Sequence, residues 1–170
     1  MNKRAVLNHI PVDLLQIDRM EFDRIQAMTE RQFDCDALPK PSELTSGFGV
    51  QIQSHVQGCV LPALPFTSVN VSGKHVWVHT STDDLVQVIL HYLRCKALNP
   101  DNTSACFLVP SRGKGTSWRP LLRGMRRLRE YKKGHELFGP SAPKLPESYV
   151  VFYDPPWPQI AALNNSELIS

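Results

Sequence analysis

The sequence has few cysteines and no long hydrophobic run, and these two features exclude several classes of protein. Its four cysteines, Cys35, Cys59, Cys95 and Cys106, form no Cys-x-x-Cys pair and lie near no histidine pair at zinc spacing. We therefore expect buried thiols and no metal site. No apolar run approaches the ~20 residues of a bilayer span, and no signal-peptide core follows the N-terminus. These absences predict an intracellular protein, cytoplasmic or nuclear, that is neither secreted nor inserted into a membrane.

Motifs of common enzyme classes are also missing. Residues 111–117 lie between a predicted strand and a predicted helix, but they lack the Gly-x-x-x-x-Gly-Lys-Ser/Thr spacing of nucleotide hydrolases. This segment is either a flexible loop or a site where Lys114 and backbone amides meet a phosphate. No Gly-x-Ser-x-Gly is present, so nothing favours a hydrolase triad, and the six histidines include no pair at metal spacing.

What is present fits one globular domain. The 170 residues are 42% hydrophobic and 21% charged, close to the averages of folded soluble proteins. A chain of this length buries a substantial core without disulfides or metals. We predict a single α/β domain over 1–170 with flexible ends at 1–12 and 158–170.

Hydrophobic periodicity predicts alternating strands and helices, most clearly after Gly73. The expected helices cover 14–31, 82–97 and 118–131, and the expected strands cover 32–38, 74–79, 105–109, 135–138 and 148–153. Residues 40–73 carry only brief apolar alternation and receive no firm element. The strand–helix–strand order favours a mostly parallel central sheet with helices on both faces and an antiparallel pair at the C-terminal end.

Positive charge is concentrated in one segment. Residues 112–133 hold 9 basic side chains and one acid, Glu130, whereas the rest of the chain holds 10 basic and 15 acidic residues. Such a concentration is typical of a phosphate-binding surface, or else it marks the outer side of an amphipathic helix that buries Leu121, Leu122, Met125 and Leu128. The candidate nucleic-acid contacts are Arg112, Lys114, Arg119, Arg123, Arg126, Arg127, Lys132 and Lys133. Trp77, Trp118 and Trp157 are either base-stacking or core residues.

Three segments of the second half resemble a known family. They are Phe107-Leu108-Val109-Pro110 with Trp118, then Tyr131-Lys132-Lys133-Gly134-His135-Glu136-Leu137-Phe138-Gly139, and then Pro143 with Val150-Val151-Phe152. Their order and spacing resemble phage-type DNA adenine methyltransferases and the methyltransferase-like segment of DIRS-type retroelement polyproteins. The resemblance covers about 20–153. It implies a Rossmann-like methyltransferase fold of phage or retroelement origin.

The resemblance also indicates where a cofactor and a catalytic loop would lie. Phe33-Asp34-Cys35-Asp36-Ala37 resembles the Asp-x-x-Ala start of the family's cofactor segment, which implies S-adenosylmethionine near Asp34 or Asp36; both acids are equally typical of turns. The family's Asn-Pro-Pro-Tyr/Phe loop is replaced by His79-Thr80-Ser81-Thr82. No side chain there supplies both an amide for the target amine and a ring for the flipped base, so His79 and Ser81 are catalytic candidates that lack the family's groups.

A second tetrapeptide, Asp154-Pro155-Pro156-Trp157, is similar to the catalytic loop of mRNA-type adenine methyltransferases. In those enzymes further strands follow the loop, whereas here 13 residues remain. Proline after an apolar strand also simply ends the strand and blocks edge pairing. Asp154, Pro155, Pro156 and Trp157 therefore stand as alternative catalytic candidates beside a structural explanation.

Three functions follow from these observations. The leading one is a catalytically degenerate methyltransferase-like domain without a cofactor, acting as an assembly module or binding nucleic acid, with DNA favoured over RNA. The alternative is an active S-adenosylmethionine-dependent adenine methyltransferase of DNA or RNA. The third is a protein-interaction scaffold whose arginines provide solubility only.

Overall fold

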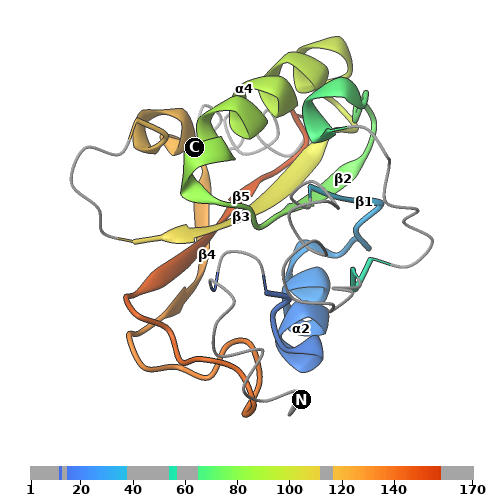
Figure 1. The fold of residues 1–170 in the computed structure, drawn as a ribbon. Helices are drawn as coiled ribbons and strands as arrows, with labels where there is room; N and C mark the ends of the chain where they lie inside the picture. The colour runs from blue at the N-terminus through green and yellow to red at the C-terminus, as the bar shows by residue number, and fades with distance from the viewer. Residues whose placement is uncertain (1–11, 13–14, 38–53, 57–64, 112–116, 158–170) are drawn as a thin grey trace, which may run out of the picture.

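The fold is that of a computed structural model (Figure 1). The structure describes residues 12, 15–37, 54–56, 65–111 and 117–157. Most of the predicted flexible ends and of the segment 40–73 lies outside these residues. In chain order the elements are α2 (Arg19–Thr29), β1 (Cys35–Asp36), the 3-10 turn η2 (Phe66–Ser68), β2 (His75–Val78), α4 (Thr82–Leu98), β3 (Ser104–Pro110), the 3-10 turn η3 (Arg119–Leu122), β4 (Arg126–Tyr131) and β5 (Tyr149–Asp154).

The strands form one mixed sheet in the order β1-β2-β3-β5-β4. Strands β1, β2 and β3 pair in parallel, while β5 pairs antiparallel with both β3 and β4. Strand β4 therefore runs in the same direction as the first three, and β5 alone runs against them. This arrangement confirms the predicted α/β class and an antiparallel C-terminal pairing.

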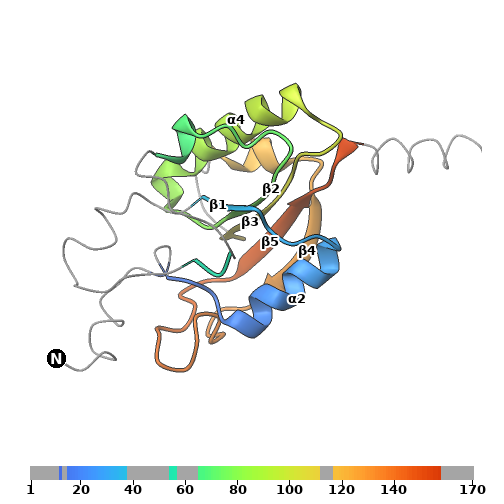
Figure 2. The ribbon, with the colours of Figure 1, turned by 90° about the vertical axis from the view of Figure 1, so that its right-hand side faces the viewer.

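Helices cover both faces of the sheet, as predicted. The long helix α4 lies on one face together with η3, and α2 lies on the opposite face (Figures 1 and 2). Two hydrophobic clusters correspond to these faces. One joins Phe22 and Ile25 of α2 to Trp77 and Val151, and the other joins Ile89 of α4 to Phe107 and the rest of that face.

Helix α4 follows directly from its sequence. The Ser81 side chain caps its first turn by accepting a hydrogen bond from the Asp83 backbone amide, and Asp83 and Asp84 place negative charge at the positive end of the helix dipole. Leu85 and Ile89 are buried one turn apart against the sheet. The predicted helix 82–97 is thus confirmed to within one residue.

Other predicted elements are confirmed with altered bounds. The helix expected over 14–31 begins only after Asp18, whose carboxylate accepts from the Met20 amide, and it ends at Thr29, before Glu30 turns into the left-handed region. The strand expected over 32–38 is reduced to β1. The strands expected over 74–79, 105–109 and 148–153 correspond to β2, β3 and β5.

Two predicted elements are wrong. The helix expected over 118–131 is replaced by η3 followed by β4, because Gly124 adopts φ +89° between them and the basic segment pairs with β5. The residues expected as a strand over 135–138 instead lie in two turns, 132–135 and 136–139, in which Gly134 and Gly139 adopt positive φ. Its Leu137 still enters the core, and the Leu137 carbonyl accepts from the Asp18 amide at 2.7 Å.

The predicted buried thiols are confirmed for Cys95 and Cys106, and burial raises the pKa of Cys106 above its usual range. Cys35 is half-buried, and Cys59 lies outside the described residues.

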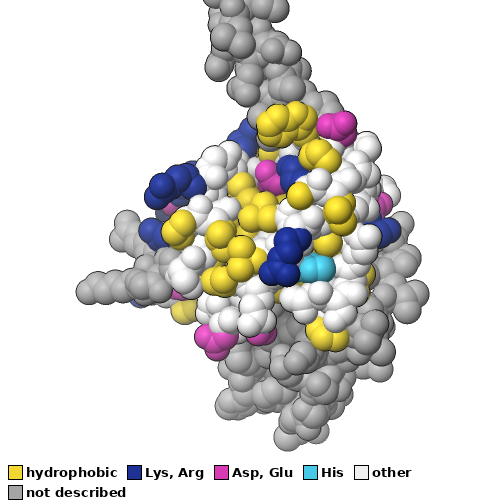
Figure 3. Space-filling model, turned by 90° about the horizontal axis from the view of Figure 1, so that it is seen from above, with side chains coloured by type: hydrophobic (Ala, Val, Ile, Leu, Met, Phe, Trp, Pro, Cys, Tyr) yellow, Lys and Arg dark blue, Asp and Glu magenta, His cyan; other side chains and the backbone are white. Residues whose placement is uncertain are grey.

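On the outer side of α4, hydrophobic side chains gather over the middle of the surface, with Lys and Arg side chains among and around them (Figure 3). Leu90 and Leu98 of α4 are both exposed large hydrophobic residues.

The packing of α4 predicts unequal costs of truncation along it. Ile89 is fully buried and Leu98 is 75% exposed. We expect Ile89→Ala to lower the free energy of unfolding by about 2–5 kcal/mol through lost burial and a residual cavity, and Leu98→Ala to change it by less than about 0.5 kcal/mol. Urea unfolding followed by circular dichroism measures both. Equal losses would contradict the placement of Ile89 in the core.

Candidate functional site

The two acids proposed for cofactor binding lie at different edges of the sheet. Asp34 precedes β1, and its Oδ2 accepts from the His75 backbone amide and from the Arg31 guanidinium, each at 2.9 Å. Asp34 therefore fastens β1 to β2 at the amino edge of the parallel strands. Ligands of open α/β sheets bind at the carboxyl edge, so this position does not suit a cofactor contact.

Asp36 does lie at the carboxyl edge, at the end of β1. Its side chain is buried, and its Oδ2 accepts from the Ser54 hydroxyl at 2.5 Å, whereas its Oδ1 has no hydrogen-bond partner among the described residues. Burial raises the pKa of Asp36 to about 7, partly offset by the Ser54 hydrogen bond. Of the two predicted acids, only Asp36 occupies a position where a ligand group would be met.

The loop after β2 is held by structural contacts. His79 is buried, its Nε2 donates to the Val12 carbonyl at 3.0 Å, and its ring stacks on Phe138 with centroids 5.6 Å apart. Ser81 caps α4. Both catalytic candidates of this loop therefore have roles in the fold, although they lie at the carboxyl edge of the sheet.

The Asp154–Trp157 tetrapeptide lies at the opposite edge. Asp154 pairs with Ala105 near the start of β3, and its Oδ2 accepts from the Tyr92 hydroxyl and from Lys96 Nζ, each at 2.6 Å. Burial and the Asp154 charge raise the pKa of Tyr92, which keeps the phenol protonated as a donor.

The prolines and tryptophan of this tetrapeptide are also tied to α4 and its exit turn. The Pro155 carbonyl accepts from Lys96, Pro156 is half-buried, and the Trp157 amide donates to the Pro100 carbonyl. The structure therefore does not bring this tetrapeptide together with the loop after β2, and the two cannot form one active site.

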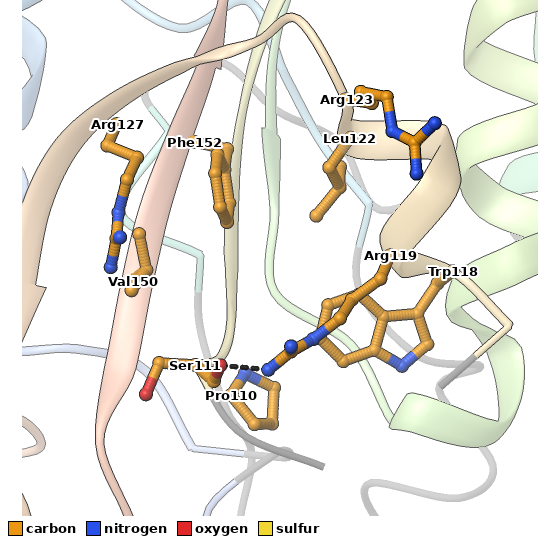
Figure 4. A pocket seen from close by; sticks show the side chains of 9 residues that line it. All are labelled: Pro110, Ser111, Trp118, Arg119, Leu122, Arg123, Arg127, Val150 and Phe152. Carbon is orange, nitrogen blue, oxygen red and sulfur yellow. Dashed lines mark hydrogen bonds between the residues drawn. The ribbon is translucent and has the colours of Figure 1, made fainter. Parts of the chain in front are cut away.

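A different site is formed where η3, β4 and β5 meet, which we call the arginine groove. It is a pocket of about 290 Å³ lined by Pro110, Ser111, Trp118, Arg119, Leu122, Arg123, Arg127, Val150 and Phe152 (Figure 4). Three of these nine side chains are guanidinium groups, and none is a carboxylate. The groove is therefore an apolar hollow with a positively charged rim.

The arginines of the rim differ in how they are held. Arg119 donates to the Ser111 carbonyl across one end of the groove, as Figure 4 shows. Arg127 is 3.7 Å from Glu130 in a largely exposed ion pair. Arg123 has no ion-pair partner among the described residues and is exposed. Arg123 and Arg127 can thus reach a ligand, while Arg119 is fixed against the backbone.

None of the other predicted nucleic-acid contacts that the structure describes lines the groove. Arg126 pairs with Tyr153 and so faces the α2 side of the sheet, whereas Arg127 pairs with Phe152 on the α4 side. Lys132 and Lys133 are exposed just after β4. Arg112 and Lys114 lie outside the described residues. The structure therefore gathers three of the eight predicted basic contacts at one pocket.

The floor of the groove carries no distinctive sequence signal. Leu122, Val150 and Phe152 come from two elements, and the strand alternation of 149–154 was the only available signal that Val150 and Phe152 share a face. Of the three tryptophans, Trp77 and Trp118 are buried and Trp157 is exposed at the other edge of the sheet. Base stacking on Trp77 or Trp118 is therefore excluded by their burial.

Comparisons of this chain with protein-family models, with curated proteins and with solved structures find no match. The methyltransferase resemblance therefore stays a prediction.

Among the described side chains, no group of three or more His, Cys, Asp or Glu is placed to hold a metal ion. None of the described helices has the length and hydropathy needed to cross a bilayer.

The burial of Asp36 predicts a pH dependence of stability. An unfolded Asp has a pKa of about 3.9, whereas that of folded Asp36 is raised to about 7, so the folded state holds the extra proton between these values. The contribution of Asp36 to the free energy of unfolding is fully present below pH ~4 and is lost as the pH rises through 7. We expect Asp36→Asn to gain on the order of 2–4 kcal/mol relative to wild type between pH 4 and pH 8.

Urea unfolding at a series of pH values measures this difference. Asp101→Asn is the matched control, because Asp101 is exposed in the turn after α4. A wild-type pH dependence that persists in Asp36→Asn would show that Asp36 titrates normally.

Proposed function

We propose that this chain is a nucleic-acid-binding module that contacts phosphates through the arginine groove, with DNA as the favoured partner. The observation that carries the proposal is the convergence of Arg119, Arg123 and Arg127 from two elements on one pocket without a lining carboxylate. Guanidinium groups bind phosphate oxygens in a bidentate way, and a basic surface on an otherwise acidic chain steers polyanions toward it.

The exposure of the two rim arginines Arg123 and Arg127 supports this proposal. The side chains of Arg127 and Glu130 are 61% and 56% exposed, so solvent screens their ion pair and a phosphate can replace the carboxylate at little cost. Arg123 gives up no described ion pair on binding. Lys132 and Lys133 add exposed positive charge just after β4.

The contacts of the catalytic candidates favour a degenerate rather than an active methyltransferase-like domain. Methyl transfer to an adenine amine needs groups that orient the amine and stack the base. The polar groups of His79, Ser81 and Asp154 that would do this are hydrogen-bonded within the fold. The two alternative loops lie at opposite edges of the sheet, so neither can supply a group that the other lacks.

An active S-adenosylmethionine-dependent adenine methyltransferase is the alternative, and Asp36 is the observation that favours it. This buried carboxyl at the end of β1 has one oxygen without a described hydrogen-bond partner, which suits a ligand hydroxyl or amine. Calorimetric titration with S-adenosylmethionine separates the two functions. Micromolar binding that Asp36→Asn abolishes would support the enzyme.

Phosphate binding at the rim predicts the effect of removing the charges of Arg123 and Arg127. We expect Arg123→Ala/Arg127→Ala to weaken binding of a fluorescein-labelled DNA at least tenfold and to lower the slope of log K against log salt by about 2, because two phosphate contacts are lost. Fluorescence anisotropy between 50 and 200 mM salt, roughly the range over which counterion release is seen, measures both quantities.

The matched control is Arg94→Ala, which removes an exposed arginine of α4 outside the groove. It should change the slope by less than the double variant does. Equal effects from Arg94 and from the groove arginines would indicate diffuse attraction to the whole protein and would contradict a phosphate site at the groove.

A further inference from the structure

The arginine groove combines two kinds of surface that a phosphate site alone does not require. Its rim carries guanidinium groups, and its floor is formed by Leu122, Val150 and Phe152. Figure 4 shows the Phe152 ring projecting between Arg127 of β4 and Leu122 of η3. The ring lines the same pocket as the rim arginines. It therefore offers a face on which a base can stack, next to guanidinium groups that can bind a phosphate.

The size of the groove bears on what would fill it. At about 290 Å³ it lies near the lower end of the ~300–1,000 Å³ typical of small-molecule pockets. A duplex presents phosphates on a convex surface and keeps its bases stacked inside, so it would touch the rim and leave the apolar floor wet. A single strand has unstacked bases that can enter a hollow and lie on an aromatic side chain.

We propose that the groove accepts one unpaired nucleotide of a single strand, with the base against the half-buried Phe152 ring and a phosphate on Arg123 or Arg127. Arg119, fixed to the Ser111 carbonyl, is a positioning residue that forms one wall. The inference rests on the proposed nucleic-acid function and adds the class of nucleic acid. Trp118 has no stacking role here because only 3% of it is exposed.

The test compares the same protein on two forms of DNA. Fluorescence anisotropy is measured with a fluorescein-labelled oligo-dT strand and with a duplex of the same length. We expect tighter binding of the strand, and we expect Phe152→Leu to weaken strand binding about tenfold through loss of the stacked ring, with duplex binding unchanged. Phe152→Trp keeps an aromatic face and should retain strand binding.

Folding and charge are controlled in the same series. Phe152→Leu keeps an apolar side chain at a half-buried position, and thermal melting within a few degrees of wild type shows that the sheet is intact. Leu90→Ala, on the exposed side of α4, is the matched apolar control and should leave strand binding unchanged. An oligo-U strand is titrated in parallel, and tight binding of either strand supports the inference.

Three results would overturn the inference. Duplex binding as tight as strand binding, with no effect of Phe152→Leu, would leave the phosphate site but remove the unpaired nucleotide. Displacement of the strand by poly-glutamate at equal charge concentration would make the groove an acidic-peptide site. Absence of binding to any nucleic acid would overturn the proposed function itself, whereas duplex binding that Arg123→Ala/Arg127→Ala weakens would leave that function standing without the unpaired nucleotide.

Discussion

The pairing of β5 on both of its edges is the constraint on which the rest of the structure depends. Within the described chain, β4 joins the sheet only through β5, which itself runs antiparallel beside β3. Alternate residues of β5 then serve different layers. Val151 and Tyr153 enter the core under α2, whereas Val150 and Phe152 line the groove on the α4 side. A shift of one residue in this register would exchange the two sets.

The same pairing decides where the positive charge lies. Strand β4 is an edge strand, and charged side chains on an edge protect a sheet from pairing with other chains. That role accounts for Arg126 and Arg127, but it does not account for Arg123, which follows η3 and borders the same pocket. Because the rim is drawn from both elements and surrounds an apolar floor, binding of a ligand explains more of the arrangement than edge protection does.

Strong local signals made β2, β3, β5 and α4 predictable from the sequence, since each is an apolar run or a capped amphipathic helix. The segment 118–131 was not, because the spacing of Leu121, Leu122, Met125 and Leu128 fits a helix as well as it fits a turn followed by a strand. Pairing with β5 decides between them, and that contact is distant in sequence. The charge count located the basic surface, but Phe152 and the split between Arg126 and Arg127 depend on this tertiary pairing.

Binding at the arginine groove is tested most directly by a nuclear magnetic resonance titration of the isotope-labelled protein with a short single-stranded oligonucleotide. A ligand in the groove should shift the amide signals of η3, of Arg127 and of Phe152 together, while those of Asp36, His79 and the Asp154 edge stay in place. Shifts centred on Asp36 and His79 would place the ligand at the carboxyl edge of the parallel strands and contradict a binding site at the arginine groove.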